Sequence, residues 1–438
     1  MKTKKMILAA IAATISGVVA LSFAGCEWFD FSNRRNTAEV SENLGYENGM
    51  GAWLASSVDS PRSSAWEQYL EAKMSGELDD SVSFMDFLKM INDDSASLTT
   101  SLRASVAILA GSFTGGGVIY SFKNGAYGTN AYVITNYHVV YNGRGITSDL
   151  HTFLYGDTFG DSRSALPTTY VGGSAQEDVA VLSVEIPAYR LNYVQSITDH
   201  VGKRDSDDVN VGEKIYAIGN PYSSGISVVS GVVAVEAEYT MLESITGGAD
   251  VETLTMRIDA PVNPGNSGGG LFDARGTYLG MVSGGSEKAV GNGSVPIDGF
   301  GYALPANRVV SVAQSIIDNL ENGTQAAYKG LLGELEITSS RGEFNEKTNS
   351  IDIVETVKIK SAHSRNPFGA EIEGKVIQRI EVQNGAGNKV VAMDILRMHQ
   401  VDTVLFNLRK GFTVTLYFAD GSNAAAEYSE DHHFVQMD

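Results

Sequence analysis

Short apolar runs separated by glycine-rich breaks fill residues 102–305, and this pattern predicts a β-rich domain. The runs include residues 117–120, 131–135, 179–184, 214–218 and 278–282. Many short strands with turn signals between them are typical of a β-barrel or a β-sandwich. The spacing of apolar positions then becomes helical over residues 307–322, and Gly323 is a stop signal for that helix.

From about residue 327 the chain mixes strand and helix patterns. Strands are expected at residues 335–337, 376–382 and 412–418, and helices at residues 392–398 and 401–408. A segment of this length can form a domain with its own core. The sequence therefore predicts one α+β domain over residues 327–425.

The N-terminus has the pattern of an export signal over residues 1–26. Three lysines in the first five residues precede an uncharged, mostly apolar stretch that ends at Cys26. The end of this stretch resembles a bacterial lipoprotein signal, in which the cysteine is lipidated. The alternative is an uncleaved signal anchor, because about 20 apolar residues can span a bilayer. Both interpretations place the rest of the chain outside the cytoplasmic membrane and attached to it.

Residues 27–100 are acidic and rich in serine and asparagine, with helical spacing at residues 65–74 and 83–91. We interpret this segment as a tether with short amphipathic helices, and a small docking module is the alternative. It contains no residue pattern that indicates chemistry.

Composition and charge exclude several classes of function. The chain has 438 residues and a formal net charge of −20, which argues against nucleic acid as a partner because phosphate binding needs clustered Lys and Arg. A single cysteine leaves no intramolecular disulfide. The sequence contains no metal-ligand cluster and no nucleotide-binding loop, so neither a metal nor another cofactor is expected.

The clearest chemical signal is the segment Asn-Pro-Gly-Asn-Ser-Gly-Gly-Gly at residues 263–270. Glycine permits the positive φ angles of a tight loop, and such a loop can aim backbone N–H groups at one point beside the Ser267 hydroxyl. Acyl transfer needs donors of this kind for the developing oxyanion. A glycine-rich hairpin with an incidental serine is the alternative.

A serine nucleophile needs a base and an orienting acid. His138 follows an apolar strand, at a position where a scaffold can present a side chain to a cleft. Asp178 leads directly into the apolar run that begins at Val179. Alone, His138 could be a structural histidine and Asp178 a turn residue. Together with Ser267 they give the order His, Asp, Ser of the chymotrypsin class.

The chain also resembles the HtrA/Deg serine proteases over about residues 105–322. The segments that carry the resemblance are Gly-Gly-Gly-Val-Ile at 115–119, Thr-Asn-Tyr-His-Val-Val at 135–140, Asp-Val-Ala-Val-Leu at 178–182, Gly-Asn-Pro-Tyr at 219–222, Ser-Gly-Val-Val at 230–233, residues 259–269 and Gly-Tyr-Ala-Leu-Pro at 301–305.

The resemblance implies a mainly β fold, with a trypsin-like double β-barrel at residues 101–322. It implies that His138 is the general base, Asp178 its orienting acid and Ser267 the nucleophile. The backbone N–H groups of Gly265 and Ser267 would form the oxyanion hole. It also implies small or medium aliphatic residues before the scissile bond and a homotrimer. Trypsins carry an acid six residues before the nucleophile, where it binds a Lys or Arg side chain of the substrate. That position is Pro261 here, so a basic residue before the scissile bond is disfavoured.

Residues 329–334 resemble the carboxylate-binding loop of a PDZ domain, which would be formed here by Leu331, Leu332, Gly333 and Glu334. PDZ domains bind extended peptides by strand addition. Glu334 would repel a ligand carboxylate if it faced the groove. The alternative is a PDZ-like fold whose groove is unused.

Taken together, the sequence predicts an extracytoplasmic, membrane-attached serine endopeptidase that cleaves misfolded or exposed polypeptides. Its expected partners are polypeptide substrates and activating peptide C-termini. The alternative is a protease-like binding protein or chaperone that holds peptides without cutting them.

Overall fold

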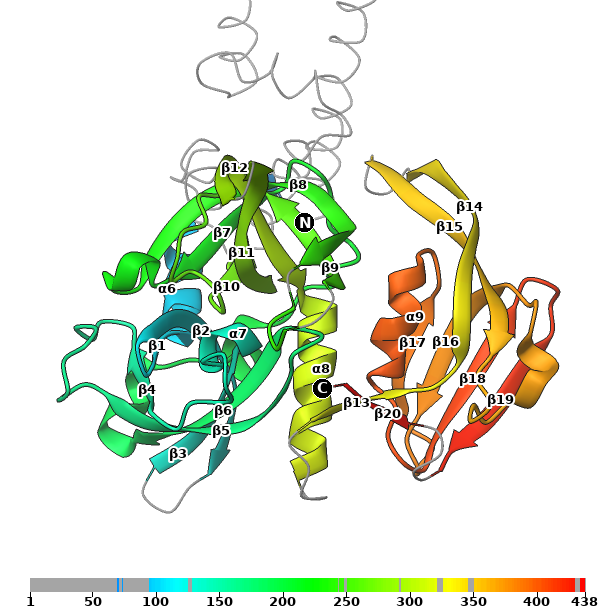
Figure 1. Cartoon of the computed structure of the whole chain (residues 1–438), viewed down its shortest axis with the longest axis horizontal. Coiled ribbons are helices and arrows are strands. Elements are labelled where there is room, and N and C mark those ends of the chain that lie inside the picture. Colours follow the sequence, from blue (N-terminus) through cyan, green and yellow to red (C-terminus); the bar gives the residue numbers. More distant parts are fainter. Residues whose placement is uncertain are drawn as a thin grey trace, which may run out of the picture. The chain divides into compact units, whose positions relative to one another are not determined.

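The computed structural model describes residues 94–124, 128–242, 244–247, 250–290, 293–320, 326–345, 350–429 and 434–437, with Tyr69, Leu70 and Lys73 (Figure 1). The export signal, Cys26 and nearly all of the expected tether lie outside these residues. Among the described residues, no helix has the length and apolar character that crossing a membrane requires.

The compact unit begins at Asp94, whereas the sequence suggests residue 101. The additional residues belong to helix α6 (Asp94–Ala104), and Leu98 from this helix packs into a hydrophobic core. The Ser101 hydroxyl also donates to the Gly276 carbonyl at 2.6 Å. The helix is therefore part of the folded unit.

Two closed antiparallel barrels form the larger part of the fold, and the expectation of a mainly β fold is confirmed. The first barrel has the strand order β1-β2-β3-β6-β5-β4. Its strands are β1 (Ser105–Ala110), β2 (Phe113–Asn124), β3 (Gly128–Thr135), β4 (Leu150–Leu154), β5 (Leu166–Ser174) and β6 (Val179–Pro187).

The second barrel has the order β10-β11-β12-β9-β8-β7. Its strands are β7 (Lys214–Gly219), β8 (Ser227–Leu242), β9 (Val251–Ile258), β10 (Gly270–Asp273), β11 (Tyr278–Val290) and β12 (Gly293–Pro305). Short helical turns lie outside the strands: α7 (Tyr137–Val140), η1 (Ala188–Tyr193), η2 (Ile197–Val201) and η3 (Pro221–Ser223).

Strand β6 shows why some runs are apolar on both faces. Successive strand side chains point to opposite sides. Ala180 and Leu182 pack inside the first barrel, while Val179 and Val181 pack into a second core that also contains helix α8 (Ala306–Asn319). A strand with both faces buried cannot alternate apolar with polar residues.

Helix α8 follows the second barrel and confirms the expected helix, although it starts one residue earlier. Val309, Val312, Ala313 and Ile316 have the i, i+3, i+4, i+7 spacing of one helical face, and all four are buried in the core that α8 shares with β6. This face attaches α8 to the barrels.

The C-terminal segment has its own core, and its described residues form three small sheets and one α-helix, α9 (Met398–Leu405). The pairs are β13 (Ala327–Gly330) with β20 (Phe434–Met437), and β14 (Gly333–Asn345) with β15 (Ser350–Ala362). The third sheet has the order β17 (Lys389–Asp394), β16 (Ile377–Gln383), β18 (Phe412–Phe418), β19 (Asn423–Tyr428). A short turn, η5 (Gly369–Ile372), lies between β15 and β16.

The helix expected at residues 392–398 is wrong. Ala392 belongs to β17 and pairs with Glu381 of β16, and α9 begins only at Met398. The β-branched residues Val390 and Val391 favour a strand, and pairing with β16 extends it to Asp394. The helix expected at 401–408 is confirmed in type, with different ends.

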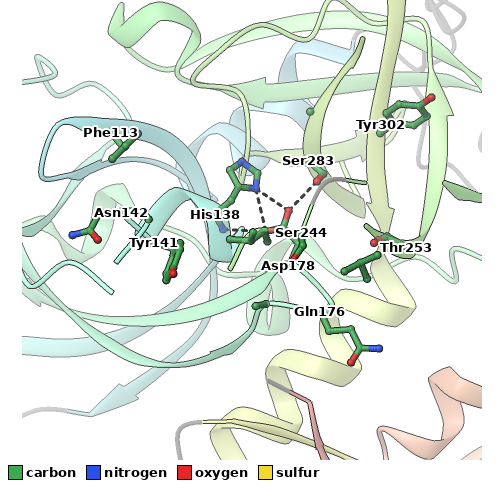
Figure 2. A pocket seen from close by; sticks show the side chains of 15 residues that line it. Phe113, His138, Tyr141, Asn142, Gln176, Asp178, Ser244, Thr253, Ser283 and Tyr302 are labelled. Atoms are coloured by element: carbon green, nitrogen blue, oxygen red, sulfur yellow. Dashed lines mark hydrogen bonds and ion pairs between the residues drawn. The ribbon is translucent and has the colours of Figure 1, made fainter. Parts of the chain in front are cut away.

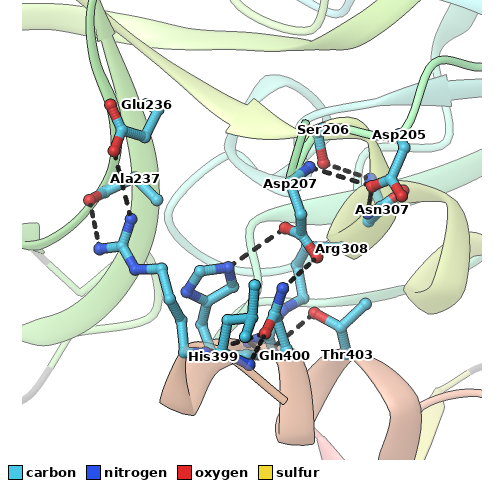
Figure 3. Close-up of polar contacts among 12 residues, drawn as sticks. Asp205, Ser206, Asp207, Glu236, Ala237, Asn307, Arg308, His399, Gln400 and Thr403 are labelled. Atoms are coloured by element: carbon cyan, nitrogen blue, oxygen red, sulfur yellow. Dashed lines mark hydrogen bonds and ion pairs between the residues drawn. The ribbon is translucent and has the colours of Figure 1, made fainter. Parts of the chain in front are cut away.

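Polar side chains connect α8 and the barrels to α9 (Figure 3). Arg308 Nη1 lies 3.4 Å from Glu177 Oε2, and Arg308 Nη2 lies 3.9 Å from Asp402 Oδ2. His399 Nε2 lies 3.2 Å from Asp207 Oδ1. The Arg308 side chain is buried, and a buried charge needs such partners.

Candidate active site

Strand pairing brings His138 and Asp178 together. Strands β3 and β6 are antiparallel, and their last pair joins Thr135 to Ala180. His138 lies three residues after Thr135, on α7, and Asp178 lies two residues before Ala180. Both side chains therefore reach the same edge of the first barrel (Figure 2).

Three donors hold the Asp178 carboxylate. His138 Nδ1 lies 2.8 Å from Oδ2, and the His138 backbone N–H donates to Oδ1 at 3.0 Å. The Ser283 hydroxyl donates to Oδ2 at 3.0 Å. The Asp178 side chain is only 8% exposed, against 36% for His138. This arrangement assigns the proton on Nδ1 and leaves His138 Nε2 free to accept one.

The electrostatics of the pair favour a basic imidazole. Burial alone would lower the pKa of His138. The charge of Asp178 and its hydrogen bond outweigh that effect and raise the pKa above its ordinary value of 6.5. His138 is therefore a stronger base than a free imidazole.

The backbone at Asp178 is strained. Its φ of 50° lies in the left-handed region, which is uncommon for residues other than glycine. Asn136 Nδ2 donates to the Asp178 carbonyl at 2.9 Å and holds this turn. Strained residues cluster at functional sites, where the surrounding structure fixes them.

The loop that carries Ser267 requires glycine at two positions. Gly265 and Gly268 have φ of 99° and 82°, and a Cβ would clash with the Asn220 carbonyl at Gly265 and with Thr135 at Gly268. The Ser267 carbonyl accepts a hydrogen bond from the Gly116 N–H at 2.8 Å. The loop thus lies directly against both barrels.

The Ser267 hydroxyl donates to the Ser283 carbonyl at 3.0 Å rather than to His138. Active-site hydrogen bonds are often formed fully only when substrate is bound. The N–H groups of Gly265 and Ser267 donate no hydrogen bond to another described residue.

The segment around η3 forms hydrogen bonds with the loop that carries Ser267. The Tyr222 N–H donates to the Pro264 carbonyl at 2.8 Å, and the Asn220 N–H donates to the Gly265 carbonyl at 3.1 Å. The Tyr222 hydroxyl also donates to Asn263 Oδ1 at 3.0 Å. These contacts fix the orientation of the peptide groups on either side of Gly265.

The expected peptide-binding residues lie together where β13 leads into β14. The Leu331 carbonyl accepts from the Tyr428 hydroxyl at 2.7 Å, and Leu332 is buried. Gly333 has a φ of 154°, and a Cβ there would clash with the Ser361 carbonyl. Glu334 Oε1 pairs with Lys360 Nζ at 2.6 Å, and the Glu334 side chain is 59% exposed.

Sequence reasoning missed the role of Ser283. The hydroxyl of Ser283 contacts Asp178 and its carbonyl contacts Ser267, so one residue touches both groups. No local pattern marks it, because serine is ordinary in a strand and the contact arises from packing between barrels.

Comparison with known proteins finds similarity over the part of the chain that contains His138, Asp178 and Ser267. Residues 115–281 match the family model described as a trypsin-like peptidase domain. The chloroplastic Protease Do-like 1 of Arabidopsis thaliana is 32% identical over 186 residues, which are 42% of this chain and 37% of that protein. The periplasmic pH-dependent serine endoprotease DegQ of Escherichia coli (strain K12) is 31% identical over 221 residues, 50% of this chain and 39% of that protein.

A solved structure of the HtrA-type protease AlgW with a tripeptide matches 77% of this chain and 96% of its own, at 21% identity and a TM-score of 0.43. The chain is thus similar to a trypsin-like peptidase domain over residues 115–281, and about half of it is similar to part of a serine endoprotease of the HtrA/Deg kind. It spans well under two thirds of the length of the two curated relatives.

Proposed function

We propose that the protein is a serine endopeptidase that cleaves misfolded or exposed polypeptides outside the cytoplasm. The single observation that carries the proposal is the His138–Asp178 pair, hydrogen bonded at 2.8 Å beside the Ser267 loop. Ser283 supports it further, because its hydroxyl contacts Asp178 and its carbonyl contacts the Ser267 hydroxyl.

The reaction follows from the roles that these groups can take. Ser267 Oγ attacks the scissile carbonyl while His138 Nε2 takes its proton. The N–H groups of Gly265 and Ser267 stabilise the oxyanion. His138 then protonates the leaving amine, and a water molecule, deprotonated by His138, hydrolyses the acyl-enzyme. Asp178 holds the imidazole and stabilises its charged form.

Degradation of casein by the purified full chain tests this activity, with a stably folded protein as the comparison substrate. We expect fragments from casein and little cleavage of the folded protein. The alternative function, a protease-like protein that holds peptides, requires that casein is bound and never cut. Failure to cleave casein or any unstructured peptide would favour that alternative.

We further propose that the C-terminal domain is PDZ-like and binds peptide C-termini. Among the described strands, β14 pairs only with β15, so one of its edges is open to strand addition. The Glu334 carboxylate forms an ion pair with the Lys360 ammonium group on the exposed side of this hairpin. Its charge therefore does not oppose a ligand carboxylate.

Glu334→Leu should leave peptide affinity nearly unchanged, because an exposed ion pair contributes little. Gly333→Ala, the matched variant, should lose binding because its backbone conformation and the Ser361 carbonyl leave no room for a Cβ. Fluorescence anisotropy with peptides that have free or amidated C-termini measures both effects. Tighter binding by Glu334→Leu would place Glu334 in the groove, and no binding by wild type would refute peptide recognition.

We propose that Cys26 is the lipidated N-terminus that attaches the protein to the membrane. Mass spectrometry of the mature N-terminal peptide should find an acylated Cys26, and Cys26→Ala should lose the lipid and change processing. A wild-type chain that still begins at Met1 would instead establish an uncleaved signal anchor.

A further inference from the structure

Asn136 is a buried amide beside the catalytic pair, and the reaction described above gives it no role. It follows the last residue of β3 and lies two residues before His138. Asn136 is fully buried, and its Nδ2 donates to the Asp178 carbonyl at 2.9 Å. It therefore contacts the backbone of the orienting acid, while His138 and Ser283 contact the carboxylate.

The Asn136 side chain does not serve the helix that it precedes. Asn136 is the residue before α7, where asparagine commonly caps a helix by accepting an N–H from the first turn. Here the side chain makes no such hydrogen bond, and the Asn136 backbone carbonyl accepts the Val139 N–H at 3.3 Å instead. Asn136 Oδ1 is buried and accepts no hydrogen bond from a described residue. Leaving a buried acceptor unpaired costs stability, so the needs of the local fold do not explain this amide.

The hydrogen bond from Asn136 opposes relaxation of the strained backbone at Asp178. A residue with a Cβ is disfavoured at a φ of 50°, so the Asp178 backbone tends to relax to a negative φ when its carbonyl is released. A rotation about φ at Asp178 also changes the direction in which its Cβ and carboxylate point. Relaxation would therefore move the carboxylate away from His138 Nδ1, which now lies 2.8 Å from Oδ2.

Asn136 is itself held on two sides, so its amide is a fixed donor. The preceding residue, Thr135, ends β3, and its hydroxyl donates to the Gly116 carbonyl at 2.8 Å. The Asn136 backbone nitrogen would lie only 3.1 Å from a Cβ at Gly268, so the loop that carries the nucleophile packs closely against it. A small displacement of catalytic groups costs a large factor in rate, and a fixed donor prevents such a displacement of the orienting acid.

We propose that Asn136 is a positioning residue of the catalytic site, whose amide holds the strained Asp178 backbone and so directs the Asp178 carboxylate at His138. The inference rests on the proposed endopeptidase function. In this role Asn136 does not contact the substrate and acts only through Asp178. Its loss should therefore slow the chemical step and leave substrate binding nearly unchanged.

Asn136→Ala removes the donor and should lower kcat about 10- to 100-fold, with KM nearly unchanged. Asn136→Val should do the same, because it also lacks the donor. Valine retains more volume than alanine and suits the extended backbone at this position, with a φ of −71° and a ψ of 147°. Steady-state kinetics with a peptide substrate separates kcat from KM.

The pH profile of kcat/KM should also change in both variants. A displaced Asp178 carboxylate raises the pKa of His138 less than the aligned carboxylate does. The midpoint of the profile should therefore move to lower pH, towards that of Asp178→Asn. A loss of stability alone would leave this midpoint unchanged.

A double variant tests whether Asn136 acts through Asp178. If it does, Asn136→Ala combined with Asp178→Asn should have nearly the kcat of Asp178→Asn alone, because the aligned carboxylate is already lost. Independent effects would instead multiply, and that result would overturn the proposal.

Asn366→Ala is the matched control. Asn366 is also a buried asparagine, and its Nδ2 donates to the Gly369 carbonyl at 3.2 Å, within the C-terminal segment. The kcat and the pH midpoint of Asn366→Ala should equal those of wild type. The thermal unfolding midpoint of each variant shows whether it is folded.

Labelling of Ser267 by a fluorophosphonate separates the positioning role from the proposed activity. Wild type that is neither labelled nor able to cleave a peptide would overturn the endopeptidase function. Labelled wild type, together with folded Asn136 variants of unchanged kcat and pH midpoint, would overturn the positioning role. Failure of both Asn136 variants to fold would also overturn it, because Asn136 would then be a residue that the fold itself requires.

Discussion

Ser267→Ala should abolish casein cleavage, with a fall in turnover on the order of 10⁶-fold. The substitution removes the only side-chain atom of Ser267 that can attack a carbonyl. The remaining His138 and Asp178 cannot compensate, because the members of a triad act as one unit. Initial rates with a fluorogenic casein, at equal concentrations of wild type and variant, measure the loss.

The fold of Ser267→Ala should be intact. The hydroxyl makes one hydrogen bond, to the Ser283 carbonyl, while the Ser267 backbone keeps its contact with Gly116. Its thermal unfolding midpoint should match that of wild type, which separates loss of chemistry from loss of structure. Retention of full activity by a folded variant would remove Ser267 from the mechanism.

Asp178→Asn should lower kcat about 10⁴-fold, because an amide would force the wrong imidazole tautomer. Asparagine also presents an NH₂ group where Asp178 now accepts from three donors, two on His138 and one on Ser283. His138→Gln cannot replace Asp178→Asn in this test, because that substitution removes the base itself. Steady-state kinetics with a peptide substrate separates kcat from KM.

The pH profile provides a second readout of the same pair. Activity requires neutral His138, so kcat/KM should rise with pH, with a midpoint above 6.5 because Asp178 raises the pKa of His138. In Asp178→Asn this charge is gone, and the midpoint should move to lower pH. An unshifted midpoint in the variant would contradict electrostatic control of His138 by Asp178.

The barrel strands could be predicted from the sequence because each strand buries at least one face. Hydrophobic cores lie on both faces of the runs at residues 179–184 and 214–218. The hairpin β14–β15 could not be predicted in full. Beyond Ile337 the side chains of β14 are mostly exposed, so this strand lacks the alternation of apolar and polar residues that marks a half-buried strand.

Some contacts of the candidate site could likewise be predicted from local sequence, and others could not. His138, Asp178 and Ser267 stand beside strand ends and glycines, which are local signals. The hydrogen bond from Ser283 to Asp178 depends on how the barrels pack, and no local sequence pattern indicates it. The direction of Glu334 likewise depends on strand register, since Glu334 pairs with Ser361 and its carboxylate meets Lys360.

The most direct test of the account is to locate the residue that a fluorophosphonate modifies. The purified full chain is labelled, digested and mapped by tandem mass spectrometry, with His138→Ala as the comparison. The account predicts one adduct, on Ser267, that forms rapidly in wild type and is nearly lost in His138→Ala. Failure of Ser267 to react, or equal labelling of Ser267 without His138, would contradict it.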